Sequence, residues 1–210
     1  MAKIIKSTFY QNGSILDGNG VILIQSELEG FNNISKDIYH QLDSTYGKFF
    51  KMDPLSKSAF LCCEALMDGI DITVNKSKIG VFLANKSGSL DTDERYQEKT
   101  FTEQGIVSNP SIFVYTLPNI MIGEICIRHG FKGEQVMWVD QAFDADYISK
   151  YVNLLFDNNI IEACVMGWVE NYNDKENVFL SWIESEHEQV IQSKDLNSNN
   201  LNSIYNQLNR

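Results

Sequence analysis

The stretch from Asn109 to Glu170 constrains the fold most, because helix-like and strand-like segments alternate along it. A helix is predicted from Leu117 to His129, and a short strand follows from Gln135 to Gln141. A second helix is predicted from Asp144 to Phe156, before an apolar strand that ends at Gly167-Trp168-Val169-Glu170. Strands separated by helices in this way are typical of α/β domains.

The segments before this stretch extend the same pattern. A helix is predicted from Asp53 to Gly69, because Asp is a good N-cap and Pro suits the first helical position. The run from Lys78 to Asn85 is mostly apolar, as expected for a strand that is covered on both faces. Ile4–Tyr10 and Val21–Gln25 are predicted to be further strands. We therefore expect an α/β domain over residues 1–185, with about five mainly parallel strands and helices on both faces.

Two further features complete the expected organisation. Gly123 interrupts the apolar helix that ends at His129 and costs about 1 kcal/mol relative to Ala, so we expect close packing against another backbone there. Residues 186–210 are predicted to be a polar, Asn-rich C-terminal tail, either a weak terminal helix or disordered.

Charge and composition exclude several classes of function. The formal net charge of -11 argues against nucleic acid, whose phosphates require clustered Lys and Arg. No window approaches the roughly 18 apolar residues that span a bilayer, and the N-terminus does not resemble a signal peptide. We expect a cytoplasmic protein without a membrane partner. The four cysteines lack zinc-type or redox spacing and are predicted to be small buried hydrophobes, so we expect no metal and no cofactor.

The same residues carry a resemblance to a known family. In order and spacing the chain from about Tyr46 to Glu184 resembles the N-terminal half of the β-ketoacyl-acyl carrier protein synthases (ketosynthases) of the thiolase superfamily. The resemblance implies a thiolase-like half as the fold. Its landmarks are Lys51-Met52-Asp53, Ile79-Gly80-Val81-Phe82, Asn109-Pro110, Pro118-Asn119, Gly130, Lys132-Gly133 and Gly167-Trp168-Val169-Glu170.

The resemblance also implies where the family's nucleophilic cysteine would lie. Counting forward from Gly133 and backward from Glu170 places it at Ala142, and a one-residue slip gives Gln141 or Phe143. None of these residues has a thiol. Chain length factors, the inactive partners of type II polyketide ketosynthases, carry Gln at this position, so the chain resembles a chain length factor. The family's second half supplies two histidines, or His and Asn, and our interpretation is that this chain corresponds to one half without them.

The family further implies a dimer interface and a tunnel. The strand before the nucleophile pairs across the family's dimer axis, which here implicates Gln135, Val136, Met137, Trp138 and Val139. As an alternative, the same strand could be central in a monomer. Ile112 and Phe113 correspond to a segment that lines the partner's acyl tunnel, together with Phe143, although Ile112 and Phe113 could equally be plain core residues. Ser87 falls on the family's gating loop.

The functional hypothesis is a non-catalytic, chain-length-factor-like subunit. It would form a heterodimer with a full-length ketosynthase and shape its acyl tunnel in type II fatty-acid or polyketide biosynthesis, with aryl polyene or flexirubin pigments as candidate products. An acyl carrier protein would be met through the partner, because carrier proteins are acidic like this chain. The alternatives are a homodimeric acyl-binding or regulatory module, and a hydrolase or transferase. For a hydrolase, Asp140 and His129 could be an acid/base pair, or simply a strand-end carboxylate and a His at a helix C-terminus.

Overall fold

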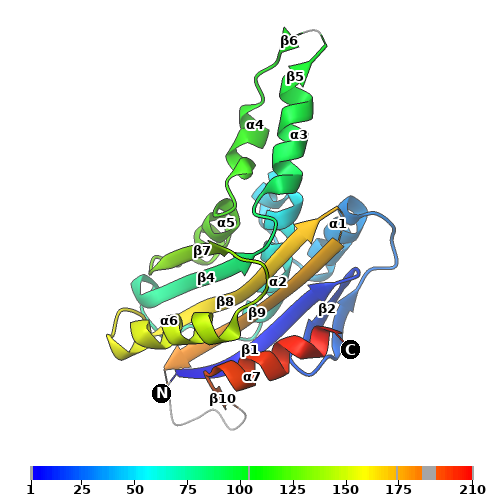
Figure 1. Cartoon of the computed structure of the whole chain (residues 1–210). Helices are drawn as coiled ribbons and strands as arrows, with labels where there is room; N and C mark the ends of the chain where they lie inside the picture. The colour runs from blue at the N-terminus through cyan, green and yellow to red at the C-terminus, as the bar shows by residue number, and fades with distance from the viewer. Residues whose placement is uncertain (1, 104, 174, 186–192, 210) are drawn as a thin grey trace.

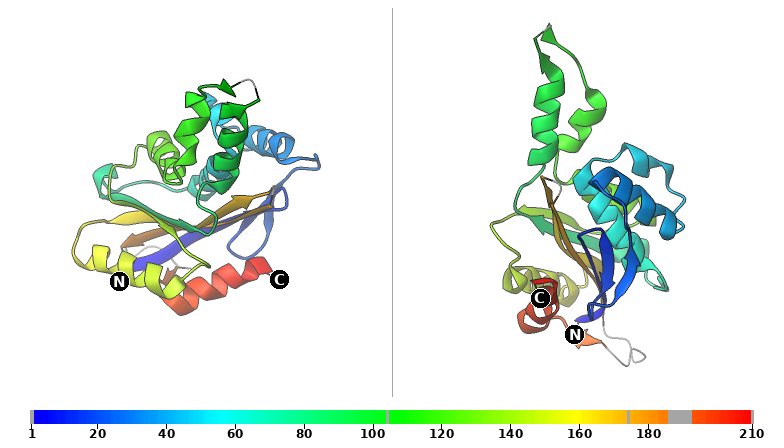
Figure 2. Two further views of the ribbon diagram at one scale, coloured as in Figure 1. Left: turned by 45° about the horizontal axis from the view of Figure 1, so that its top comes forward. Right: turned by 90° about the vertical axis from the view of Figure 1, so that its right-hand side faces the viewer.

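A mixed sheet between two helical layers forms the body of the protein (Figures 1 and 2). The computed structural model describes residues 2–103, 105–173, 175–185 and 193–209. Within them the main sheet has eight strands in the order β3-β2-β1-β9-β8-β4-β7, and β10 also pairs with β1. These strands are β1 Ala2–Gln11, β2 Ser14–Asp17, β3 Ile22–Gln25, β4 Ile79–Asn85, β7 Gln135–Val139, β8 Ala163–Tyr172, β9 Lys175–Ser185 and β10 Lys194–Asp195.

The sheet confirms the α/β class, but its strand number and directions differ from the expectation. Two pairs of the described strands are parallel, β4 with β7 and β4 with β8, whereas the other pairs in this sheet are antiparallel. Only two residues separate Tyr172 of β8 from Lys175 of β9, whereas a parallel crossover requires a dozen or more residues. The expectation of a mainly parallel sheet with about five strands is therefore wrong in the number of strands and in their direction. Short hairpins add β2 and β3 beside β1.

Helices cover both faces of the sheet, as predicted. α1, α2 and α5 pack with one apolar cluster, and α6 and α7 pack with the other. The α-helices are α1 Phe31–Gln41, α2 Pro54–Met67, α3 Leu90–Thr100, α4 Pro110–Phe113, α5 Ile120–His129, α6 Ala145–Asp157 and α7 Ser198–Tyr205. Short 3-10 helices are Gly47–Lys51, Lys76–Lys78, Val114–Thr116 and Asn206–Asn209.

The buried helix α2 begins as the sequence predicts and anchors α5. The Asp53 carboxylate accepts a hydrogen bond from the Ser56 backbone N–H at 3.0 Å, and Pro54 follows it. From α5, Arg128 donates to Glu64 on α2 at 2.9 and 2.8 Å. Gly123 does not have the expected role, because a Cβ added there would meet no atom within 4 Å.

The described part of the C-terminal tail packs against the body. Asn197 caps α7 by accepting from the Asn200 N–H at 2.9 Å, and Leu201 and Ile204 are buried. α7 lies beside α6 on the same face of the sheet (Figure 2). Residues 186–192 lie outside the described residues, so the division between residues 1–185 and a separate tail stays a prediction.

Residues 90–103 and 105–117 project from the body, and we call them the arm (Figure 1). They comprise α3, the small hairpin of β5 Phe101–Thr102 and β6 Gly105–Ile106, and α4. Phe101 faces Ile106 across this hairpin, and they are 61% and 79% exposed. Among the described residues no single helix is long and apolar enough to cross a membrane. The segments Pro110–Thr116 and Ile120–His129 meet that test only together, across a 98° bend.

Candidate functional site

The candidate site lies where the parallel strands β4, β7 and β8 end. In α/β sheets this carboxyl edge is the usual place for ligand contacts. The turn Asp140–Asp144 follows β7, the loop Lys86–Ser89 follows β4, and Glu170 lies near the end of β8. The Asp140 backbone N–H donates to the Asn85 carbonyl oxygen at 2.8 Å, which holds the turn against β4.

Two aspartates fix the shape of the turn. Asp140 Oδ1 accepts from the Gln141 N–H at 2.7 Å, and Asp144 Oδ1 accepts from the Tyr147 N–H at 2.9 Å. Asp144 is thus the N-cap of α6, a position that Asp favours because its side chain satisfies an unpaired backbone donor. Gln141 and Ala142 are exposed between them. The position predicted for the nucleophile is therefore reachable from outside, and it presents a methyl group.

Phe143 points away from that surface. It is buried, with its ring centroid 4.7 Å from that of Tyr205 and 5.4 Å from that of Phe179. Its ring therefore packs behind the turn and against the C-terminal helical region, whereas the neighbouring Ala142 lines a cavity of about 210 Å³.

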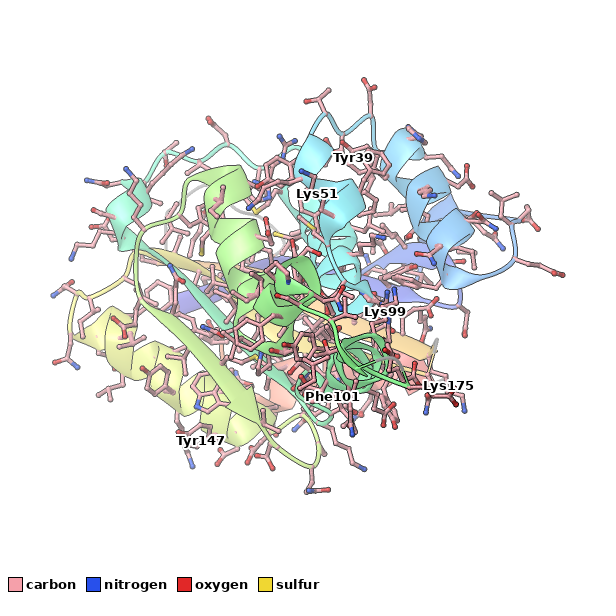
Figure 3. All side chains as sticks on the ribbon, turned by 90° about the horizontal axis from the view of Figure 1, so that it is seen from above. Tyr39, Lys51, Lys99, Phe101, Tyr147 and Lys175 are labelled. Atoms are coloured by element: carbon pink, nitrogen blue, oxygen red, sulfur yellow. The ribbon has the colours of Figure 1, made fainter. Side chains whose placement is uncertain are left out.

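This cavity lies between the end of β7 and the start of α6. Its lining consists of Ala84, Trp138, Val139, Asp140, Ala142, Asp144, Tyr147 and Ile148. The Trp138 ring meets those of Tyr147 and Tyr151 edge-on at 5.7 and 5.3 Å. In Figure 3, Tyr147 lies beside β7 and away from the arm residues Lys99 and Phe101. The lining thus combines aromatic and aliphatic residues with two aspartates.

The loop that carries Ser87 is held by a carboxylate. Glu170 Oε2 accepts from the backbone N–H groups of Lys86 at 2.8 Å and Ser87 at 3.1 Å. Asn85 closes the loop from the other side by exchanging hydrogen bonds with Gly88 at 2.8 and 3.1 Å. In the sequence Glu170 is recognisable only as the last residue of a motif. The signal in the sequence that could have revealed its role is that this carboxylate lies at the end of an apolar predicted strand.

The predicted interface strand β7 lies at an edge of the sheet. Within the described residues it pairs only with β4, so the alternative of a central strand is wrong. Val136, Met137 and Trp138 are half-buried, whereas Gln135 is exposed and Val139 is 60% exposed. An unpaired strand edge with apolar residues is a surface on which another chain can pair.

Ile112 and Phe113 lie on α4 of the arm, apart from the Ala142 turn (Figure 1). Phe113 is 54% exposed and Ile112 is half-buried, so neither is a plain core residue in this chain. The Phe113 ring lies 5.6 Å from that of Tyr96 on α3. At the base of the arm, Tyr115 donates to the buried Glu124 at 3.1 Å, and Thr92 donates to Asp53 at 2.9 Å. The exposed pair Phe101 and Ile106 was not predicted, although the neighbouring Gly105 is a turn signal in the sequence.

The other chemically interesting residues have structural surroundings. His129 Nε2 lies 3.2 Å from Glu64 Oε1 at the end of α5, so His129 does not pair with Asp140. All four cysteines are buried as predicted, and burial raises the pKa of the Cys62 and Cys126 thiols to about 12. Among the described residues, no group of three or more His, Cys, Asp or Glu side chains could hold a metal ion.

No protein-family model and no curated protein matches the sequence, but solved structures match the fold. The ishigamide ketosynthase/chain length factor has a TM-score of 0.66 at 16% identity, over 88% of this chain and 62% of that chain. The second structure is AntDE:AntF, a type II polyketide synthase acyl-carrier protein in complex with its ketosynthase bound to the hexaketide. Its TM-score is 0.66 at 12% identity, and the match covers 88% of this chain and 62% of that chain. A ketosynthase (ApeO) in complex with its chain length factor (ApeC) from Xenorhabdus doucetiae has a TM-score of 0.58 at 10% identity, over 99% and 92%.

These likenesses show a thiolase-type fold, the fold of ketosynthase and chain length factor subunits. At such low identity they establish the fold alone, since one fold hosts many functions. The chain spans 62% of the length of the first two structures.

Proposed function

We propose that this chain is a non-catalytic, chain-length-factor-like subunit that pairs with a full-length ketosynthase and shapes its acyl tunnel. The observation that carries the proposal is the methyl group of Ala142, exposed at the turn before α6. Condensation requires a nucleophile that holds the acyl group and donors that stabilise the enolate. Ala142 cannot be acylated, and its neighbours Gln141 and Phe143 have no thiol that could replace it.

The edge strand β7 would be the pairing surface. Its exposed edge includes Gln135 and Val139, and a partner strand would satisfy the outward backbone groups and cover the half-buried residues between them. Ketosynthase complexes among the structural neighbours support a synthase as this partner. A homodimer through the same edge is the alternative, and the experiment below distinguishes the two.

The arm would reach the partner's tunnel. Its apolar residues, Phe113 on α4 and the tip residues Phe101 and Ile106, are exposed, and such residues are typical of surfaces that another protein covers. In this proposal Ile112 and Phe113 limit tunnel depth, and Ser87 lies on the gate. The role of Phe143 is indirect, because its ring packs behind Ala142 and fixes the turn.

An acyl carrier protein would dock on the synthase instead of on this chain. The net charge of -11 opposes contact with an acidic carrier protein. We place the complex in type II fatty-acid or polyketide biosynthesis, and aryl polyene and flexirubin pigments are the first products to test.

The test is co-purification with a full-length ketosynthase from the same gene neighbourhood. Gln135→Asp places a charge on the β7 edge, away from the cavity beside Ala142, and should weaken the complex about tenfold or more. Leu23→Asp is the matched control, because Leu23 is 48% exposed on β3 at the opposite edge of the sheet. Separate elution of the unmodified proteins at micromolar concentration would refute the heterodimer, and a dimer of this chain alone would favour the alternative.

A further inference from the structure

The cavity beside Ala142 is too small for a polyketide chain. Its volume is about 210 Å³, whereas small-molecule pockets usually measure about 300–1,000 Å³. One amino-acid side chain is a better match for this volume. The cavity lies between the end of β7 and the start of α6, at an edge of the sheet, so its occupant can come from a protein that lies along the β7 edge.

The chemistry of the lining selects a cation. Asp140 and Asp144 both line the cavity, and no Lys, Arg or His is among the lining residues. Each aspartate uses Oδ1 for a backbone N–H, which leaves the charge of the carboxylate available. The nearby Lys150 is engaged elsewhere, since its Nζ lies 2.6 Å from Asp146 Oδ2.

The walls favour arginine over lysine. Trp138 and Tyr147 present rings that meet edge-on at 5.7 Å, and aromatic faces attract cations. A guanidinium group is planar, stacks on such rings and donates several hydrogen bonds in fixed directions, whereas an ammonium group is a compact, strongly hydrated charge. We therefore propose that the cavity binds an arginine side chain of the partner ketosynthase. This inference rests on the proposed function, and it adds a specific polar anchor next to the β7 edge.

The charge of the whole chain agrees with this anchor. At a net charge of -11, the chain attracts a basic protein surface over a distance and then requires a local contact that fixes the register. An arginine between Asp140 and Asp144 would align the partner strand with β7, because both aspartates belong to the turn that directly follows this strand.

The experiment compares Asp140→Asn and Asp144→Asn, singly and together, in titrations with the ketosynthase at low and high salt. Asn is also a good N-cap, so Asp144→Asn removes the charge and keeps the start of α6. The double variant should bind about ten- to a hundredfold more weakly, as expected for lost charge-assisted hydrogen bonds, and with a smaller salt dependence. Asp146→Asn is the matched control, because Asp146 is exposed on α6 outside the cavity, and it should bind within about twofold of the unmodified chain.

A second readout identifies the occupant. Arginine-selective labelling with phenylglyoxal, followed by mass spectrometry, should show one synthase arginine protected in the complex and labelled again in the complex with the double variant. If the double variant binds with unchanged affinity, or if no arginine is protected, the arginine inference is wrong. The proposal of a heterodimer would still stand in either case. Absence of any complex with the unmodified chain instead refutes the proposed function.

Discussion

Replacing Glu64 by Gln should destabilise the protein by about 3 kcal/mol at neutral pH. Burial alone would raise the pKa of Glu64, but the neighbouring His129 and the hydrogen bonds from Arg128 and Ser44 outweigh it and lower the pKa from 4.5 to about 2. Each pKa unit corresponds to about 1.4 kcal/mol, which gives the stated size. The geometry agrees, since Arg128 donates at 2.9 and 2.8 Å and the Ser44 hydroxyl at 2.8 Å.

The pH dependence gives this prediction its sharper form. The folded-state pKa of Glu64 lies below the unfolded value, so its contribution is fully present above about pH 4.5 and is lost as the pH falls through about 2. Urea unfolding of the unmodified chain and of Glu64→Gln should therefore give curves whose difference shrinks with acidification. Glu29→Gln is the control, because Glu29 is exposed, and it should change stability by less than about 0.5 kcal/mol. Equal stability at neutral pH, or a difference that does not shrink in acid, would refute the reasoning.

Four further variants test the backbone and the proposed site. Gly167→Ala should cost about 3 kcal/mol or more in thermal or urea unfolding, because the new Cβ would lie 1.9 Å from the Phe179 carbonyl oxygen; a neutral result would contradict this packing. Gly123→Ala should stabilise α5 by about 0.5–1 kcal/mol, and destabilisation of the isolated chain would show a contact that the structure lacks. Ile112→Trp should shorten the products of the synthase complex, and unchanged product length would remove Ile112 from the tunnel. Ala142→Cys should give no condensing activity in the isolated chain, since a thiol alone does not supply the enolate-stabilising donors; turnover would sink that view.

The segments that alternate most clearly in the sequence were the easiest to predict. The capping residue Asp53 predicts the start of α2. The hydrophobic pattern predicts the buried strand β4 and the order of elements from α5 to β8. Strand direction was harder, because it depends on connections. The two residues between Tyr172 and Lys175 are too few for a parallel crossover, although the alternation of strands and helices favours parallel strands.

Other features depend on tertiary contacts that no local pattern reveals. The four-residue strand β2 is flanked by turn residues, and no strand was predicted there. The Asn-rich segment Ser198–Tyr205 forms α7 because Leu201 and Ile204 are buried against the sheet, and tertiary packing of this kind stabilises a short helix. The aromatic and acidic cavity joins Trp138 of β7 to Tyr147 of α6, so it exists only once the turn between them is in place.

Native mass spectrometry of the complex after exposure to an acyl carrier thioester tests the central claim most directly. We predict one copy of this chain bound to one synthase subunit, with the acyl group on the synthase and none on residues 140–144 of this chain. An acyl group on that turn, or a synthase that is loaded without ever binding this chain, would contradict the account.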